Sequence, residues 1–99
     1  MKFEWDPKKE EINIQKHGVT FEQASCVFSD PYSLSKYDEE NSLEEDRWLL
    51  LGKAINEVLL VVVHTFKDQD DVELVRIISA RKATKTERKE YQRRHPYER

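Results

Sequence analysis

The second half of the chain holds three apolar runs that predict strands. They cover Arg47 to Ala54, Val58 to Phe66 and Val72 to Ala80, and the short polar breaks between them are typical of an antiparallel meander. Every residue from Val58 to Val63 is apolar, so both faces of this strand should be covered and it should lie at the centre of the sheet. We expect helices over one face and only partial cover over the other, where a site would have room.

The N-terminal third predicts two short helices. Asp6-Pro7 is a helix start and Gly18 is a left-handed stop, which places the first helix over residues 7–17. Thr20 and Gln23 form a capping box that opens the second helix. The tight glycine turn between the two predicts a helical hairpin.

Weaker signals complete the order of elements. Asp30-Pro31 ends the second helix, residues 32–37 alternate weakly as an edge strand, and residues 38–46 carry six acidic side chains typical of an exposed loop. A second capping box over residues 84–87 opens a last helix that Pro96 ends. The sequence therefore predicts an α+β fold with two N-terminal helices, an antiparallel three- to four-stranded sheet and a C-terminal helix.

Length and composition predict a small cytoplasmic protein with a single domain over residues 1–99. No stretch approaches the roughly 20 apolar residues of a membrane span, and the charged N-terminus is unlike a signal peptide. The single cysteine, Cys26, is interpreted as a packing residue. The three histidines are scattered and only two glycines occur, so we expect no metal, no cofactor and no glycine-rich phosphate loop.

Charge is distributed unevenly along the chain. Residues 76–99 hold nine Lys and Arg against three Asp and Glu, whereas residues 1–75 hold eight against seventeen. The net charge of −3 therefore conceals a basic segment of the kind that attracts phosphates. Because the segment consists of a predicted strand and a predicted helix, its cations should be held in place to recognise or cleave a polyanion.

Metal-free RNA cleavage is a chemistry that such a segment can perform. It needs a base for the 2′-hydroxyl proton, an acid for the leaving 5′-oxygen, and cations for the charge that develops on the phosphate. An imidazole titrates near neutral pH, and a guanidinium matches phosphate with paired hydrogen bonds. The suitable side chains are His64, Arg76 and Arg81 for catalysis, with Lys82, Tyr91 and Lys53 for substrate binding.

Each candidate also has a plainer interpretation. His64, at the end of the central strand, can be a hydrogen-bonded structural residue. Arg76 can pair with Glu73 or with a carboxylate of the acidic loop, and Tyr91 can pack the last helix onto the sheet. Arg81 and Lys82 can simply be solvated residues at the end of the strand or can contact a partner. Lys53 can be an exposed lysine of a hairpin.

Strand alternation raises a specific difficulty for the two arginines. Arg76 and Arg81 differ by an odd number of positions, so a regular strand places them on opposite faces. Either a bulge near Ser79 realigns them, or only one of them belongs to the site.

Five segments occur in a familiar order, namely FEWDPKK, KHGVTFEQA, VFSDP, LLVVVHTF and RIISARKATKTERKEY. Together they resemble the BrnT family, the toxin half of type II toxin–antitoxin pairs. The resemblance implies a RelE-like ribonuclease fold, an mRNA-cleaving activity that slows translation, and a neighbouring BrnA-like antitoxin that wraps the toxin and carries a DNA-binding element. It points first to His64 and to the two arginines of RIISAR. Residues 38–46 and Arg93 to Arg99 depart most from the family pattern, so nothing is transferred to them.

Competing functions remain open at this point. The leading hypothesis is an endoribonuclease toxin that acts on RNA without metal, is neutralised by the antitoxin, meets DNA only through the antitoxin complex, and has no membrane partner. Whether it forms a homodimer stays open. The alternative is a non-catalytic basic module acting as co-repressor in a DNA-bound complex, which binds in a salt-sensitive way and yields no product strands. A structural interaction domain would require carboxylates of the chain to neutralise the arginines.

Overall fold

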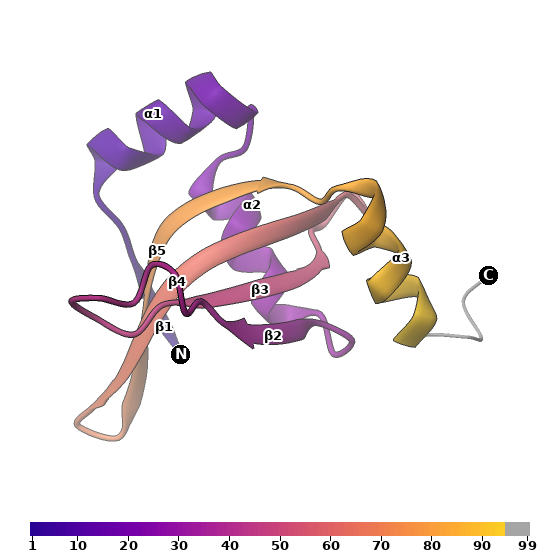
Figure 1. The fold of residues 1–99 in the computed structure, drawn as a ribbon. Helices are drawn as coiled ribbons and strands as arrows, with labels where there is room; N and C mark the ends of the chain where they lie inside the picture. The colour runs from indigo at the N-terminus through magenta and orange to yellow at the C-terminus, as the bar shows by residue number, and fades with distance from the viewer. Residues whose placement is uncertain (95–99) are drawn as a thin grey trace.

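A mixed five-stranded sheet forms the centre of the computed structural model, which describes residues 1–94 (Figure 1). The strand order is β1-β5-β4-β3-β2, with β1 parallel to β5 and the other neighbours antiparallel. In chain order the elements are β1 (Lys2–Glu4), α1 (Pro7–His17), α2 (Phe21–Cys26), the 3₁₀ turn η1 (Val27–Ser29), β2 (Leu34–Tyr37), β3 (Trp48–Lys53), β4 (Leu59–Gln69), β5 (Val72–Lys82) and α3 (Lys85–Arg94).

The observed sheet corrects the predicted fold class. An antiparallel sheet of three to four strands behind two N-terminal helices was wrong, because β1 precedes the helices and lies parallel to β5. Phe3 of β1 pairs with Val75 and packs against Phe28, with ring centroids 5.2 Å apart. A three-residue strand has no periodicity to detect. It forms because β5 offers an edge to pair with and η1 offers an apolar contact.

Capping residues set the helix bounds that the sequence predicted. Asp6 accepts a hydrogen bond from the N–H of Lys8 at 2.9 Å, and Gly18 ends α1 with a φ of 68°, which glycine adopts at little cost. Thr20 and Gln23 each accept a hydrogen bond from the other's backbone N–H, so the predicted capping box is present. Within residues 1–94, no helix combines the length and the apolar character needed to cross a membrane.

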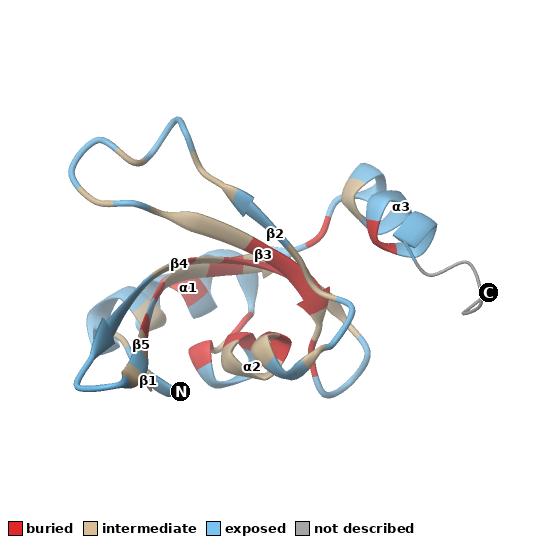
Figure 2. Cartoon of the chain, turned by 90° about the horizontal axis from the view of Figure 1, so that it is seen from below, coloured by how far each residue is buried: buried red, intermediate tan, exposed pale blue. Residues whose placement is uncertain are grey.

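β4 lies in the middle of the sheet, as predicted, and separates two apolar clusters. Figure 2 shows α1 and α2 on one side of the curved sheet, while the loop between β2 and β3 rises on the other side. The larger cluster fills the space under α1 and α2. The smaller one lies on the opposite face, where α3 packs, and consists of Leu51, Val61, Ala83 and Tyr91. Within residues 1–94, α3 therefore covers one end of this second face, and the loop between β2 and β3 rises beside the rest of it.

A β-bulge in β5 changes which of its residues reach the second face. Val63 pairs with Ser79, whereas the next residue, His64, pairs with Ile77, so Ile78 is the extra residue. One extra residue reverses the alternation of side chains beyond it. The β5 side chains in the larger core are accordingly Val75, Ile77 and Ala80.

Asn13 ties α1 to the part of β5 that β1 does not reach. β1 pairs with β5 only as far as Arg76. Beyond that point the side-chain amide of Asn13, which is 4% exposed, donates to the carbonyl of Ala80 at 2.8 Å and accepts from its N–H at 3.0 Å. It also donates to the carbonyl of Val19 at 2.9 Å. The amide thus takes the place of a neighbouring strand and positions the backbone next to Arg81.

Candidate functional site

The bulge places Arg76 and Arg81 on the same face of the sheet. Arg76 lies opposite Thr65 and Arg81 opposite Val61, on the side away from α1 and α2. The sequence had left this outcome open and had located the required bulge near Ser79. We call this side of the sheet, which bears Arg76, Ser79 and Arg81, the arginine face.

A bidentate ion pair holds Arg81 at one end of the arginine face. Its Nη1 and Nη2 donate to the two carboxylate oxygens of Glu87 at 2.7 and 2.9 Å, and Nη1 also donates to the carbonyl of Lys82 at 3.3 Å. The hydrogen bond from Arg81 lowers the pKa of Glu87 to about 2, so this carboxylate is ionised at neutral pH. Glu87 also accepts from the N–H of Thr84 in the capping box of α3. The first turn of α3 therefore fixes the guanidinium of Arg81, while 39% of the Arg81 side chain is still exposed.

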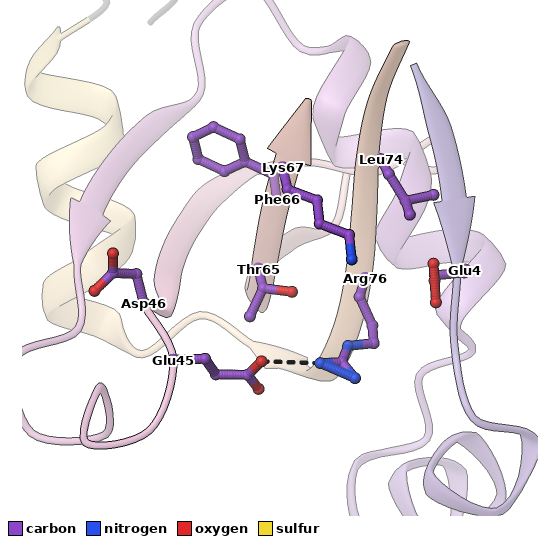
Figure 3. A pocket seen from close by; sticks show the side chains of 8 residues that line it. All are labelled: Glu4, Glu45, Asp46, Thr65, Phe66, Lys67, Leu74 and Arg76. Carbon is purple, nitrogen blue, oxygen red and sulfur yellow. Dashed lines mark hydrogen bonds and ion pairs between the residues drawn. The ribbon is translucent and has the colours of Figure 1, made fainter. Parts of the chain in front are cut away.

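Arg76 lies at the other end, in a hollow of about 320 Å³. Its Nη2 donates to Oε2 of Glu45 at 2.9 Å, an interaction that raises the pKa of Arg76 and lowers that of Glu45. Figure 3 shows the two side chains meeting across the hollow, one from β5 and the other from the loop before β3. Both are accessible, with 47% of the Arg76 side chain and 38% of the Glu45 side chain exposed. The residues that line the hollow are Glu4, Glu45, Asp46, Thr65, Phe66, Lys67, Leu74 and Arg76.

The two guanidinium groups occupy separate positions on this face. Thr65 and Val61, the β4 residues opposite them, are four positions apart, which is about 13 Å along a strand. Different carboxylates hold the two groups, one from the loop and one from α3. The arrangement therefore suits two phosphates of one strand better than a single phosphate.

His64 lies on the opposite face from the arginines. It pairs with Ile77 of the larger core, is 5% exposed, and packs edge-on against Phe28 with ring centroids 4.8 Å apart. Burial lowers the pKa of His64, so the imidazole is neutral at pH 7. The expectation that His64 and the arginines share one open patch is corrected, because β4 sends alternate side chains to opposite faces and His64 is on the face that η1 covers.

Lys82 is also separated from Arg81. It pairs with Leu60 of the larger core and lines a small hollow beside Gly18 and Val19, at the turn between α1 and α2. Neighbouring residues of a strand face opposite ways. A phosphate on the arginine face therefore cannot contact Lys82 and Arg81 together.

Lys53 and Tyr91 meet near the α3 end of the arginine face. Nζ of Lys53 lies 5.9 Å from the ring centre of Tyr91. Tyr91 is 2% exposed, and its hydroxyl donates to Oδ2 of Asp30 at 2.7 Å, an oxygen that also accepts from the backbone N–H of Lys53 at 2.8 Å. Tyr91 thus packs α3 onto the sheet, and Lys53 is the member of this pair that can reach solvent.

Arg76 was the one predicted site residue among the eight that line the hollow, and the polar residues that were missed there include Glu45, Thr65 and Lys67. The acidic loop was a signal that a carboxylate faces the basic segment, and pairing of Arg76 with this loop was among the interpretations. Which of the six acidic side chains reaches Arg76 depends on the path of the loop. Alternation along β4 predicts that Thr65 and Lys67 lie on the same face, but it does not reveal that Arg76 of β5 lies beside them.

The arginine face can bind anions and transfer a proton. Two guanidinium groups supply fixed positive charge, and the Glu45 carboxylate beside one of them can accept a proton. Among residues 1–94, no group of three or more His, Cys, Asp or Glu side chains is arranged to hold a metal ion. The two guanidinium groups therefore give this face the chemistry of an anion-binding surface.

Comparisons with known proteins identify the family. The solved structure described as the 1.1 Å crystal structure of the Brucella abortus ribonuclease toxin, BrnT, is 28% identical to this chain, with a TM-score of 0.57 and coverage of 86% of this chain and 99% of that one. Comparison with curated proteins gave no match. The family model described as "Ribonuclease toxin, BrnT, of type II toxin-antitoxin system" matches residues 5–87. The chain therefore belongs to the BrnT family of ribonuclease toxins of type II toxin–antitoxin systems.

Proposed function

We propose that this toxin is an endoribonuclease that cleaves RNA on the arginine face by metal-independent acid–base chemistry and thereby inhibits translation in the cytoplasm. The observation that carries the proposal is the fixed placement of Arg76 and Arg81 on one partly open face of the sheet. Membership of the BrnT family supports RNA as the substrate class and an antitoxin as the partner. The two arginines then bind phosphates, and the face between them supports the nucleotide chain.

A phosphate can replace the carboxylate that contacts Arg81, and a second phosphate can bind Arg76 beside the carboxylate of Glu45. A guanidinium has five N–H donors, and its planar fork fits a phosphate as well as a carboxylate. Glu87 already demonstrates a two-point anion contact at Arg81. Within residues 1–94, Arg76 donates a single side-chain hydrogen bond, to Glu45, so most of its donors remain for a phosphate.

Further cations extend the positive charge at both ends of the face. Lys67 lines the hollow around Arg76, and Lys53 lies near α3 at the other end. These lysines act as point charges that attract the RNA backbone, whereas the arginines orient individual phosphates. His64 supports the fold from the opposite face in this account.

The antitoxin is proposed to be BrnA-like and to neutralise the toxin by covering the arginine face. A partner that occupies both guanidinium groups removes both phosphate positions together. DNA would then be reached only through the antitoxin. A non-catalytic co-repressor would bind nucleic acid through the same cations. The two functions therefore differ in whether cleaved RNA fragments are formed.

Incubation of the purified chain with labelled single-stranded RNA in excess chelator tests the proposed function. We expect fragments that end in a 2′,3′-cyclic phosphate and a 5′-hydroxyl, because an attacking 2′-oxygen displaces the 5′-oxygen. A fully 2′-deoxy strand of the same sequence should bind in a salt-sensitive way and stay intact. Salt-sensitive RNA binding without fragments would instead support the binding module, and fragments formed only after addition of a divalent ion would contradict the mechanism.

A further inference from the structure

We propose that Glu45 is the general base of RNA cleavage, taking the proton of the 2′-hydroxyl while Arg76 holds the adjacent phosphate. This inference rests on the proposed function and names the group that performs its proton transfer. It assigns a catalytic role to a residue of the acidic loop. Neither the charge of the basic segment nor the family resemblance had suggested a catalytic residue in this loop.

The need for a base on the arginine face follows from the position of His64. That imidazole is 5% exposed on the other side of the sheet, in contact with Phe28. A base must lie within hydrogen-bond reach of the proton that it removes. A substrate bound to Arg76 or Arg81 therefore requires an acceptor from the same face as these two side chains.

Two carboxylates contact the arginines of this face, and their remaining contacts distinguish them. Both oxygens of Glu87 accept from Arg81, and its Oε1 accepts from the N–H of Thr84 as well, so this carboxylate serves the helix cap. Glu45 accepts from Arg76 through Oε2, and its Oε1 lies 3.8 Å from Nη2 of Arg47, beyond hydrogen-bond length. Oε1 of Glu45 is therefore the oxygen with capacity for a substrate proton.

The surroundings of Glu45 can accommodate a nucleotide. Its carboxylate borders a hollow of about 320 Å³, and 38% of its side chain is exposed. The neighbouring Asp46 instead accepts a hydrogen bond from the hydroxyl of Tyr37 at 2.9 Å. A phosphate bound to Arg76 would lie next to Glu45, because the two side chains are already 2.9 Å apart.

The charges around Glu45 keep its carboxylate ionised in the protein without substrate. The hydrogen bond from Arg76 is the main reason that its pKa is lowered. A bound phosphate shares Arg76 and adds negative charge, so the pKa of Glu45 should rise in the complex and its basicity should increase. The charged groups that face Glu45 are Arg76 of β5, Arg47 of its own loop and Lys9 of α1, together with Glu4, Asp46 and Lys67 around the hollow.

The reaction step balances with water as the only additional reactant. Oε1 of Glu45 takes the 2′-hydroxyl proton, the 2′-oxygen forms a bond to phosphorus, and the bond from phosphorus to the 5′-oxygen breaks. The 5′-oxygen takes a proton from a solvent water, which regains one from Glu45. Arg76 stabilises the negative charge on the phosphoryl oxygens as the two bonds exchange.

Replacement of Glu45 by Gln tests this role, with Glu44→Gln as the matched control. Glu44 is an exposed neighbour on the same loop, so both variants lose one negative charge at almost the same place. We expect Glu45→Gln to lower kcat by about 100-fold or more, as is typical when a general base is removed. Glu44→Gln should cleave at the unchanged rate, and Glu45→Asp should recover part of the loss.

The pH profile separates a base from a structural residue. A carboxylate base is lost on protonation, so kcat of the unchanged protein should fall as pH decreases through the pKa of Glu45 in the complex. Glu45→Gln should lack this acid limb while still binding the uncleavable 2′-deoxy strand. Affinity for that strand should stay equal or increase, since Gln no longer competes as an anion for Arg76.

Two results would overturn the assignment, and a third would reject the proposed function itself. Cleavage by Glu45→Gln at the rate of Glu44→Gln would exclude Glu45 as the base. Faster cleavage by Glu45→Gln would show that the carboxylate only competes with RNA for Arg76. If the unchanged protein gives no cleavage in chelator, the proposed function fails first, and the role of Glu45 fails with it.

Discussion

Replacement of Arg76 and Arg81 together by Gln is expected to lower the rate of RNA cleavage by about 1,000-fold. Each guanidinium can hold a phosphate through charge-assisted hydrogen bonds, and loss of one donor to a developing oxyanion typically costs about 100-fold to 1,000-fold. The effects of the two need not add, because both act on one bound strand. Initial rates on labelled RNA in chelator, at a fixed salt concentration, measure the loss.

A matched variant controls for the change in net charge. Arg88→Gln with Arg93→Gln removes the same two charges from exposed positions of α3. It should weaken attraction of the RNA and the salt dependence of binding, yet leave most of the cleavage rate. The variant of Arg76 and Arg81 should remain folded, because the carboxylates that lose a partner, Glu45 and Glu87, are themselves partly exposed. The control variant should remain folded because both of its positions are exposed. Equal losses in the two double variants would contradict a specific role for the arginine face.

Replacement of Asn13 by Ala is expected to reduce the free energy of unfolding by about 3 kcal/mol, the largest stability effect that we predict. Its amide makes three buried hydrogen bonds, and their loss leaves the N–H and C=O of Ala80 and the carbonyl of Val19 without this partner. A buried polar group left unpaired typically costs about 1–3 kcal/mol. Urea unfolding followed by circular dichroism measures the change.

Gln15 offers the matched control for Asn13. It lies on the same helix and is exposed, so Gln15→Ala removes an amide of similar size without breaking a buried contact. We expect this variant to unfold within about 0.5 kcal/mol of the unchanged protein, as surface substitutions usually do. A loss from Asn13→Ala no greater than that of Gln15→Ala would show that β5 does not depend on this amide.

Local signals account for the parts of the fold that could be predicted. The bounds of α1 follow from Asp6 and Gly18, and the opening of α2 follows from Thr20 with Gln23, because these residues satisfy backbone groups close to them in the chain. The unbroken apolar run from Val58 to Val63 likewise indicated the central strand. Such features need no knowledge of distant residues.

Long-range pairing accounts for the parts that could not be predicted. β1 exists because residues 2–4 reach the edge of β5, and nothing in their own composition reveals this contact. The odd number of positions between Arg76 and Arg81 showed that the two can share a face only if a bulge lies between them, and only the register against β4 reveals that bulge, at Ile78. The face on which His64 lies depends on the same register.

The pair formed by Glu45 and Arg76 illustrates the limit for the candidate site. Thirty-one positions separate the two residues in the chain. Composition shows that the loop is acidic and that the last third is basic, so attraction between them was foreseeable. Which carboxylate meets which guanidinium depends on how the loop folds over the sheet, and charge counts carry no information about that path.

The most direct test of the account compares His64→Phe with the double variant of Arg76 and Arg81 in one cleavage experiment in chelator. Phe suits the aromatic surroundings of His64, where Phe28 and Phe66 pack, and His64→Gln provides a second variant that keeps a polar group. We expect folded His64 variants to cleave RNA at close to the unchanged rate and the double arginine variant to cleave it about 1,000-fold more slowly. Folded His64 variants without activity, beside an active double arginine variant, would contradict the claim that the arginine face performs the reaction.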